Sequence, residues 1–183
     1  MSPDNLDRDA WAAAGLLALE EDGVTGVTGA GVARRLGVTR GSFYWHFASR
    51  DDLLAAVLQT WEREHSDDLL DALERIEDPR ARLRALVDAS TGKPASIFIR
   101  LLDAADSEPL VADTLRRSAD RRLAVIARAC RETGLAPAEA RRRALLMYAA
   151  YVGLAQLQRD DPGRMKEAEQ RAYARHAAAT LIP

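Results

Sequence analysis

Apolar residues recur at intervals of three and four along most of the chain, the spacing that places them on one face of an α-helix. Trp11, Ala14, Ala18 and Leu19 show this spacing near the start. Period-two alternation and strand-turn-strand signals are not found. The pattern predicts an all-α fold of about nine helices, over residues 6–22, 28–36, 39–47, 49–76, 79–91, 94–105, 109–133, 137–158 and 163–181.

Helix-start signals mark most of these segments. Thr28, Thr39 and Ser49 are expected N-caps, and Pro79, Pro94, Pro109, Pro137 and Pro162 each lie near a predicted helix start. The helix that begins at Ser49 is expected to run unbroken to about Ile76 and to link two domains, residues 1–50 and 51–183.

Composition narrows the class of protein. The 183-residue chain carries a net charge of −2 and one cysteine, Cys130, so it has no disulfide framework and no thiolate metal set. The first residues are charged, and no apolar stretch is long enough to span a bilayer. We expect a cytoplasmic protein without membrane contact.

Positive charge is concentrated in one short segment. Between Gly23 and Asp51 there is no acidic residue, while Arg34, Arg35, Arg40 and Arg50 lie there with the aromatic run 43–47. The pair Gly37-Val38 divides the segment into two short helices. A compact basic helix-turn-helix is attracted to a phosphate backbone, so this segment is predicted to contact DNA.

The spacing of the aromatic residues suggests separate roles for them. Phe43 and Phe47, four apart, are expected in the core, which leaves Tyr44 and Trp45 near the outer face. The alternative is that all the aromatic residues are core and the arginines a solvated face. The chain would then be a helical protein-interaction module without specific DNA binding.

These residues resemble the helix-turn-helix of TetR-family transcriptional regulators. The resemblance covers roughly the first 55 residues and is carried by VTRGSFYWHFASRDDLL, residues 38–54. It implies base-proximal positions for Arg40, Gly41, Ser42 and Trp45, with Thr39 beside them, and phosphate contacts for Thr28, Tyr44, His46 and Arg50. Gly29, Ala30 and Gly31 depart from residues common in the family, which predicts a looser second helix.

For the C-terminal region the resemblance implies a homodimer interface and an effector pocket. Residues 144–157 are apolar nearly all round, so this helix and the last one are expected to pair with their symmetry mates. A monomeric core is the alternative. Side chains that could face a pocket for an unknown small-molecule effector are Trp61, His65, Phe98, Leu101, Leu102, Met147, Tyr148 and Tyr151.

Catalysis is not expected. His46, His65 and His176 fall on different predicted helices, and no nucleophile, P-loop or dinucleotide motif is present. One Glu-x-x-His pair, Glu62 with His65, is too little for a metal site. No cofactor and no metal are expected. Together with the resemblance, the sequence leads to the hypothesis of a homodimeric, ligand-responsive transcriptional repressor that binds a pseudo-palindromic operator.

Overall fold

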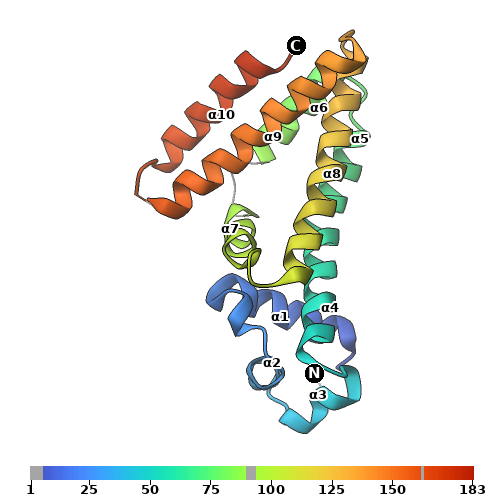
Figure 1. The fold of residues 1–183 in the computed structure, drawn as a ribbon, viewed down its shortest axis with the longest axis vertical. Coiled ribbons are helices and arrows are strands. Elements are labelled where there is room, and N and C mark those ends of the chain that lie inside the picture. The colour runs from blue at the N-terminus through green and yellow to red at the C-terminus, as the bar shows by residue number, and fades with distance from the viewer. Residues whose placement is uncertain (1–5, 90–93, 162) are drawn as a thin grey trace. The chain divides into compact units, whose positions relative to one another are not determined.

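The computed structural model describes residues 6–89, 94–161 and 163–183, and it confirms the all-α expectation (Figure 1). The described residues form ten α-helices, a 3₁₀ turn and a π-helical turn, and contain no strand. Their bounds are α1 (Arg8–Asp22), η2 (Val24–Gly26), α2 (Gly29–Leu36), α3 (Arg40–His46), α4 (Arg50–Glu62), η3 (Arg63–Asp67), α5 (Asp68–Glu74), α6 (Pro79–Ala89), α7 (Pro94–Ala104), α8 (Pro109–Glu132), α9 (Pro137–Asp160) and α10 (Glu167–Leu181).

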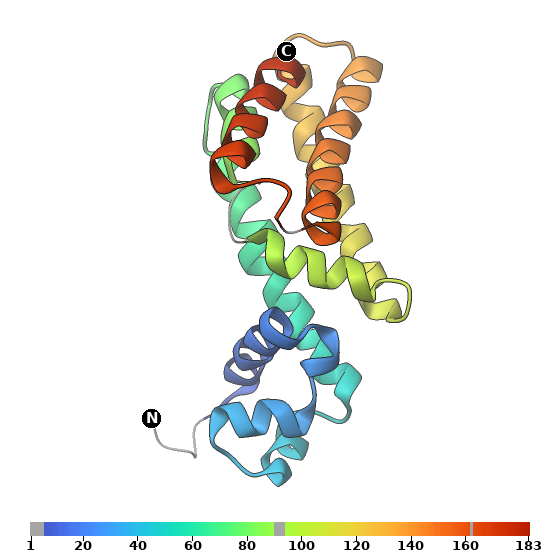
Figure 2. The same ribbon diagram turned by 90° about the vertical axis from the view of Figure 1, so that its left-hand side faces the viewer.

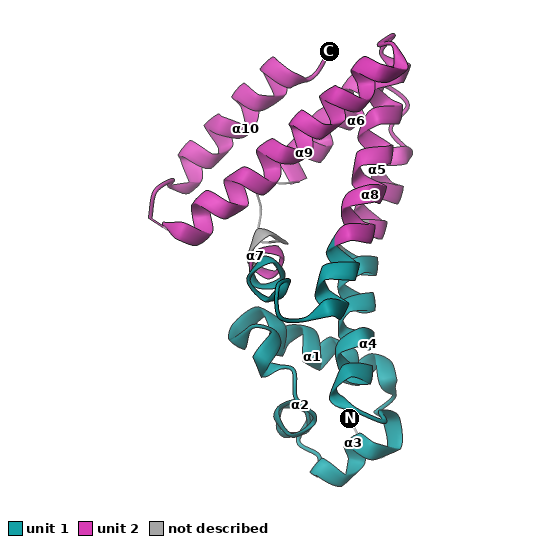
Figure 3. Ribbon diagram, in the orientation of Figure 1, with its two compact units in different colours: residues 1–65, 100–115 teal, residues 66–99, 116–183 magenta. Residues whose placement is uncertain are grey.

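The chain divides into two compact units, coloured separately in Figure 3. Unit 1 comprises residues 1–65 and 100–115, and unit 2 comprises residues 66–99 and 116–183. This division differs from the predicted boundary after residue 50. The reason is that α4 packs on α1, where Val57 lies against Gly15, so α4 belongs to unit 1. Leu54, Val57 and Leu58 of α4 are fully or almost fully buried.

In unit 1, α1 and α4 approach closely because glycine occupies the contact. A Cβ atom placed on Gly15 would lie 2.4 Å from Cγ2 of Val57. Trp11 of α1 is completely buried and lies against Phe43 and Phe47, with ring centroids 5.9 and 6.1 Å away. The core of unit 1 therefore joins α1, α3 and α4.

The predicted unbroken helix over residues 49–76 is wrong in one respect. Its helical path continues from α4 to α5, but residues 63–67 form the π-helical turn η3. In an uninterrupted α-helix, Leu70 would lie about two and a half turns after Trp61, so the two side chains would point to opposite sides of the helix. A π turn adds a residue and so changes the direction in which the following apolar residues face.

Unit 2 has its own core, formed by residues from α5, α6, α8 and α9. Leu83 of α6, Cys130 of α8 and Ala144 of α9 are almost completely buried there. Helices α9 and α10 run side by side in Figures 1 and 2. Unit 2 thus folds around apolar faces that are distinct from those of unit 1.

Proline and capping signals placed most helix starts correctly, with one exception. Pro79, Pro94, Pro109 and Pro137 are each the first residue of a helix. The last helix was expected from residue 163 but begins at Glu167, where the Lys166 N–H donates to the Glu169 carboxylate at 2.8 Å. Residues 163–166 instead belong to a turn in which the Arg164 N–H donates to the carbonyl of Asp161. Pro162 lies outside the described residues.

Candidate functional site

Two short helices of unit 1, α2 and α3, form the predicted helix-turn-helix. Thr28 caps α2, its hydroxyl oxygen accepting from the Gly31 N–H at 3.0 Å. Gly37 ends α2 in the left-handed region, with φ of 71°, and its N–H donates to the last carbonyls of that helix. Because glycine adopts this conformation without steric cost, the chain turns directly from α2 into α3.

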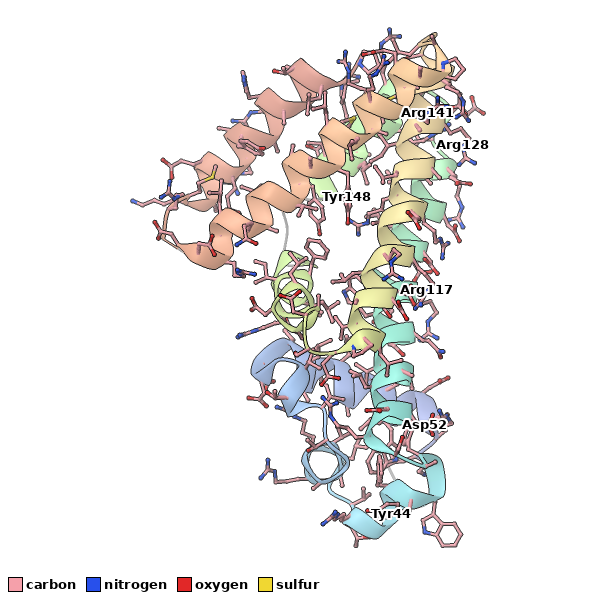
Figure 4. All side chains as sticks on the ribbon, viewed as in Figure 1. Tyr44, Asp52, Arg117, Arg128, Arg141 and Tyr148 are labelled. Carbon is pink, nitrogen blue, oxygen red and sulfur yellow. The ribbon has the colours of Figure 1, made fainter. Side chains whose placement is uncertain are left out.

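One face of α3 is buried and the other is open. Phe43 and Phe47 are buried, as their spacing predicted, while 62% of Tyr44 and 87% of Trp45 are exposed. Figure 4 shows Tyr44 on α3. Arg40 and Gly41, at the start of the helix, are also exposed, and Ser42 is half-buried. Trp45 therefore offers a large apolar surface that no described part of this chain covers.

Gly29 was noted in the sequence only as a departure from the family pattern, but in the structure it has a packing role. A Cβ atom at this position would lie 2.8 to 3.0 Å from three atoms of the Phe43 ring. The absence of a side chain on α2 thus lets Phe43 pack directly against that helix. A larger residue there would displace α3.

Arg8 ties the far end of α3 to α1 and α4. Its guanidinium donates to both carboxylate oxygens of Asp52 and to the carbonyl of His46, and it lies 4.3 Å from the centroid of the Phe47 ring. The hydrogen bond from Arg8 lowers the pKa of the Asp52 carboxyl, and a second bond from the Ala48 N–H lowers it further. Sequence reasoning missed this cluster because its members are far apart in the chain.

The basic segment presents fewer available charges than its sequence indicates. Arg35 pairs with Glu21 and Asp22 at 2.7 and 2.9 Å. Arg34 and Arg40 are exposed and make no ion pair with any residue that the structure describes. Arg40 is therefore the charge that α3 itself offers to an anionic partner.

Arg50, expected to bind phosphate, is held within unit 1. Its guanidinium lies 2.9 Å from Glu108 and donates to the Val24 carbonyl at 3.1 Å. The carboxylate of Glu108 neutralises the positive charge of Arg50, to which a phosphate would otherwise bind. This geometry favours a role in joining the start of α4 to neighbouring segments of unit 1.

Two other expected contact residues have internal partners. The His46 ring is half-buried with its centroid 5.9 Å from that of Trp11, although part of it remains accessible. The Thr39 hydroxyl does not cap α3 and lies 3.2 Å from the Ser42 hydroxyl. The Thr28 hydroxyl oxygen accepts the N-cap hydrogen bond from Gly31. Its own proton is not used in this bond and can be donated to another acceptor.

The residues expected to line a pocket are distributed over both units. Phe98, Met147, Tyr148 and Tyr151 belong to unit 2, where the latter three line a small cavity with Arg122. Trp61, Leu101 and Leu102 belong to unit 1, and the first two are buried. The His65 side chain lies outside the described part of the structure. Arg122 was missed because nothing in the arginine-rich sequence of α8 distinguishes it from its exposed neighbours.

Other kinds of site are not found in the described part of the chain. No group of three or more His, Cys, Asp or Glu residues there lies close enough to hold a metal ion. No described helix combines the length and apolar composition needed to cross a membrane.

Two short helices joined by a glycine turn, α2 and α3, pack with α1 in unit 1 and have the architecture of a helix-turn-helix domain. Residues 12–57 match the model of the bacterial regulatory proteins of the tetR family. Residues 12–57 therefore form a helix-turn-helix domain of the TetR-family type. The match covers α1 to the first half of α4.

Solved structures share this fold over almost the whole chain. A transcriptional regulator from Rhodococcus sp. Rha1 is 23% identical, with a TM-score of 0.80 over 97% of this chain and 96% of that one. A TetR transcription regulator from Haloarcula marismortui is 19% identical, with a TM-score of 0.77 over 95% of each chain. A protein from Saccharomonospora viridis, in complex with choline, is 20% identical, with a TM-score of 0.82 over 96% of each chain. Among proteins with curated annotation, none matches this chain.

Proposed function

We propose that this protein is a cytoplasmic, homodimeric, ligand-responsive repressor that reads a pseudo-palindromic operator through α3. The observation that carries the proposal is the composition of the open face of α3. Arg40, without an ion pair among the described residues, lies on the same short helix as the exposed Tyr44 and Trp45, while Phe43 and Phe47 anchor the opposite face. Trp45 gives this face a large apolar side chain that a bound partner can cover.

The exposed residues suit different parts of a DNA duplex. Arg40 can bind a guanine edge through two hydrogen bonds, and Gly41 and Ser42 allow the helix to approach the base edges closely. Tyr44, Thr28 and the accessible part of His46 can donate to phosphate oxygens, and Trp45 can cover a thymine methyl group or a sugar. We leave Arg50 out of the contact set because Glu108 already pairs with it.

Substitutions on α3 test this assignment of roles. Arg40→Ala should cost about 1–3 kcal/mol of binding free energy on a selected operator and relax preference at one base position. Tyr44→Phe should weaken binding to every sequence alike, since it removes a phosphate contact. Both variants are measured by fluorescence anisotropy on the selected duplex and on duplexes with single base changes.

Arg35→Ala is the matched control, because that arginine is already paired with Glu21 and Asp22. It should bind like the wild type. If Arg40→Ala kept both affinity and base preference, α3 would not be a reading helix. The protein-interaction module would then be the better account of the exposed aromatic residues.

The outer face of α9 supports the dimer. Leu145, Leu146 and Leu157 are 59%, 55% and 46% exposed and lie on one face with Ala149 and Gly153. On α10, Ala168, Ala172 and Ala179 are exposed along one side, while Tyr173 and Ala177 line a cavity with residues of α9. Two apolar, small-residue faces on adjacent helices suit a four-helix contact between two copies.

Response to a ligand requires that the effector prefers the state that does not bind DNA. Equal affinity for both states would leave the operator occupied. We propose that an effector bound in unit 2 acts through the continuous helical path of α4, η3 and α5, which connects the two units along the chain. No catalytic step is part of this function.

A further inference from the structure

One arginine of the basic segment is held by a carboxylate from a distant part of the chain. Nη2 of Arg50, the first residue of α4, lies 2.9 Å from Oε1 of Glu108 and donates to the Val24 carbonyl at 3.1 Å. Its Nη1 lies 3.7 Å from Oδ1 of the neighbouring Asp51. All four residues belong to unit 1. Both terminal nitrogens of this guanidinium therefore face groups of the protein itself.

The place of Arg50 in the chain would otherwise suit contact with a DNA backbone. It follows His46, the last residue of α3, by four residues, so its backbone lies at most about 14 Å from the end of that helix. Residues 24–50 contain no acidic residue, and Glu108 comes from outside this segment. A guanidinium matches carboxylate and phosphate oxygens in the same geometry. Glu108 therefore takes the position that a phosphate could take.

The pair is partly open to solvent. The side chain of Arg50 is 34% exposed and that of Glu108 is 25% exposed. An ion pair in contact with water contributes little to stability, because water screens the attraction between its charges. Opening this pair leaves neither charge buried without a partner, since water reaches both groups. Arg50 can therefore exchange one anionic partner for another without unfolding of unit 1.

Glu108 is fixed to the start of α8 through its backbone. Its carbonyl accepts from the Val111 N–H at 3.0 Å and from the Ala112 N–H at 3.2 Å, and Val111 is completely buried. Residues 109–115 of α8 belong to unit 1 and the rest of the helix belongs to unit 2, as the colours in Figure 3 show. A displacement of α8 would therefore carry the Glu108 carboxylate with it.

We propose that the ion pair between Arg50 and Glu108 is an autoinhibitory latch, in which the carboxylate withholds the arginine from the phosphate backbone of DNA. The inference rests on the proposed function in taking α3 as the helix that reads DNA. With the latch closed, Arg50 adds nothing to DNA affinity. With the latch open, it binds a phosphate and raises the affinity for every sequence alike, because a phosphate contact carries no base information.

The test removes the carboxylate and leaves the arginine in place. Glu108→Gln keeps the shape of the side chain and both backbone hydrogen bonds of residue 108. The full-length protein is titrated by fluorescence anisotropy onto a selected operator duplex and onto a duplex of scrambled sequence, at several salt concentrations. Glu108→Gln should bind both duplexes several-fold more tightly than the wild type. The slope of log affinity against log salt concentration should steepen by about one for each arginine released.

Asp106→Asn is the matched control for the change in net charge. Asp106 is exposed in the same connection between α7 and α8 and takes no part in the pair, so its variant should change affinity and salt slope much less. In an Arg50→Gln background, Glu108→Gln should gain no more than this control, since no arginine is then released. Glu108→Ala removes the carboxylate oxygens altogether. It should gain at least as much as Glu108→Gln, and it serves if that variant does not fold.

Three outcomes would overturn the latch: a gain no larger than that of Asp106→Asn, a gain that persists without Arg50, or a loss of affinity. The last would mean that the pair positions α4 for binding. If the wild type selects an operator and the Glu108 variants gain nothing, the proposed function stands and the latch fails. If the wild type and the Glu108 variants bind no duplex even at low salt, the proposed function fails and the latch fails with it.

Discussion

Gly15 shows how much of this fold depends on single residues. It lets α1 and α4 approach so closely that even a methyl group would overlap Val57, at 2.4 Å. Val57 itself is completely buried, so neither side has open space into which to move. The core of unit 1 is therefore sensitive at this position to the smallest possible addition.

Gly15→Ala should destabilise unit 1 by about 1–3 kcal/mol, as overpacking of a filled core does, despite the better helix propensity of alanine. The measurement is the midpoint of thermal or urea unfolding. Gly41→Ala is the control, because a Cβ atom there would meet only the Thr39 hydroxyl, at an ordinary 3.6 Å. Equal stability of the two variants would mean that α1 and α4 are less tightly packed than described.

Residue roles were predictable where they depend on local spacing. Phe43 and Phe47 were expected in the core because four residues separate them, and both are buried. Pairings across long stretches of chain were not predictable. Glu108 neutralises Arg50, and only the fold brings these two residues together. Arg122 was missed for the same reason, since its burial depends on α6 and α9.

At the scale of elements, the position of α3 depends on the cluster around Arg8. Its bonds to Asp52 and to the His46 carbonyl connect the start of α1, the end of α3 and the start of α4. Asp52 also accepts from the Ala48 N–H in the connection between α3 and α4. Loss of the charge of Asp52 should therefore make the position of α3 less fixed.

Acid should weaken this cluster. The pKa of Asp52 in the folded protein lies below its ordinary value of 3.8, chiefly because Arg8 donates to it. Its contribution to stability is therefore complete above that value and is lost as the pH falls through the lower, folded pKa. Asp52→Asn should lower the melting temperature at pH 7 and flatten its decline below about pH 4.

Asp51→Asn is the control, since Asp51 is largely exposed and its pairing with Arg50 spans 3.7 Å. It should retain the steeper decline in acid. A wild-type pH profile in Asp52→Asn would show that the Arg8 cluster does not stabilise the folded state.

Element boundaries were predictable wherever a local signal sets them. Four prolines begin helices at the expected residue, and the side chains of Thr28 and Ser49 form the expected caps. The two errors have other causes. The π turn at residues 63–67 depends on which sides of the flanking helices are buried, and the delayed start of α10 depends on a turn after Asp161.

At the scale of the whole molecule, the sequence predicted two domains with a boundary after residue 50, close to the start of a helix. The contacts group α4 and residues 100–115 with unit 1. A cap marks the end of an element, but only packing decides to which unit that element belongs. The match to the TetR-family model also extends past residue 50, to residue 57 within α4.

We propose that two copies of α3 read one operator. The most direct test is selection of bound sequences from random duplex DNA at two salt concentrations. We expect an enriched inverted repeat whose half-sites lie about one helical turn, or a multiple of it, apart. Binding should weaken as the salt concentration rises. Absence of an enriched sequence, or weak binding that disappears with modest salt, would contradict it and leave the open face of α3 to a protein partner.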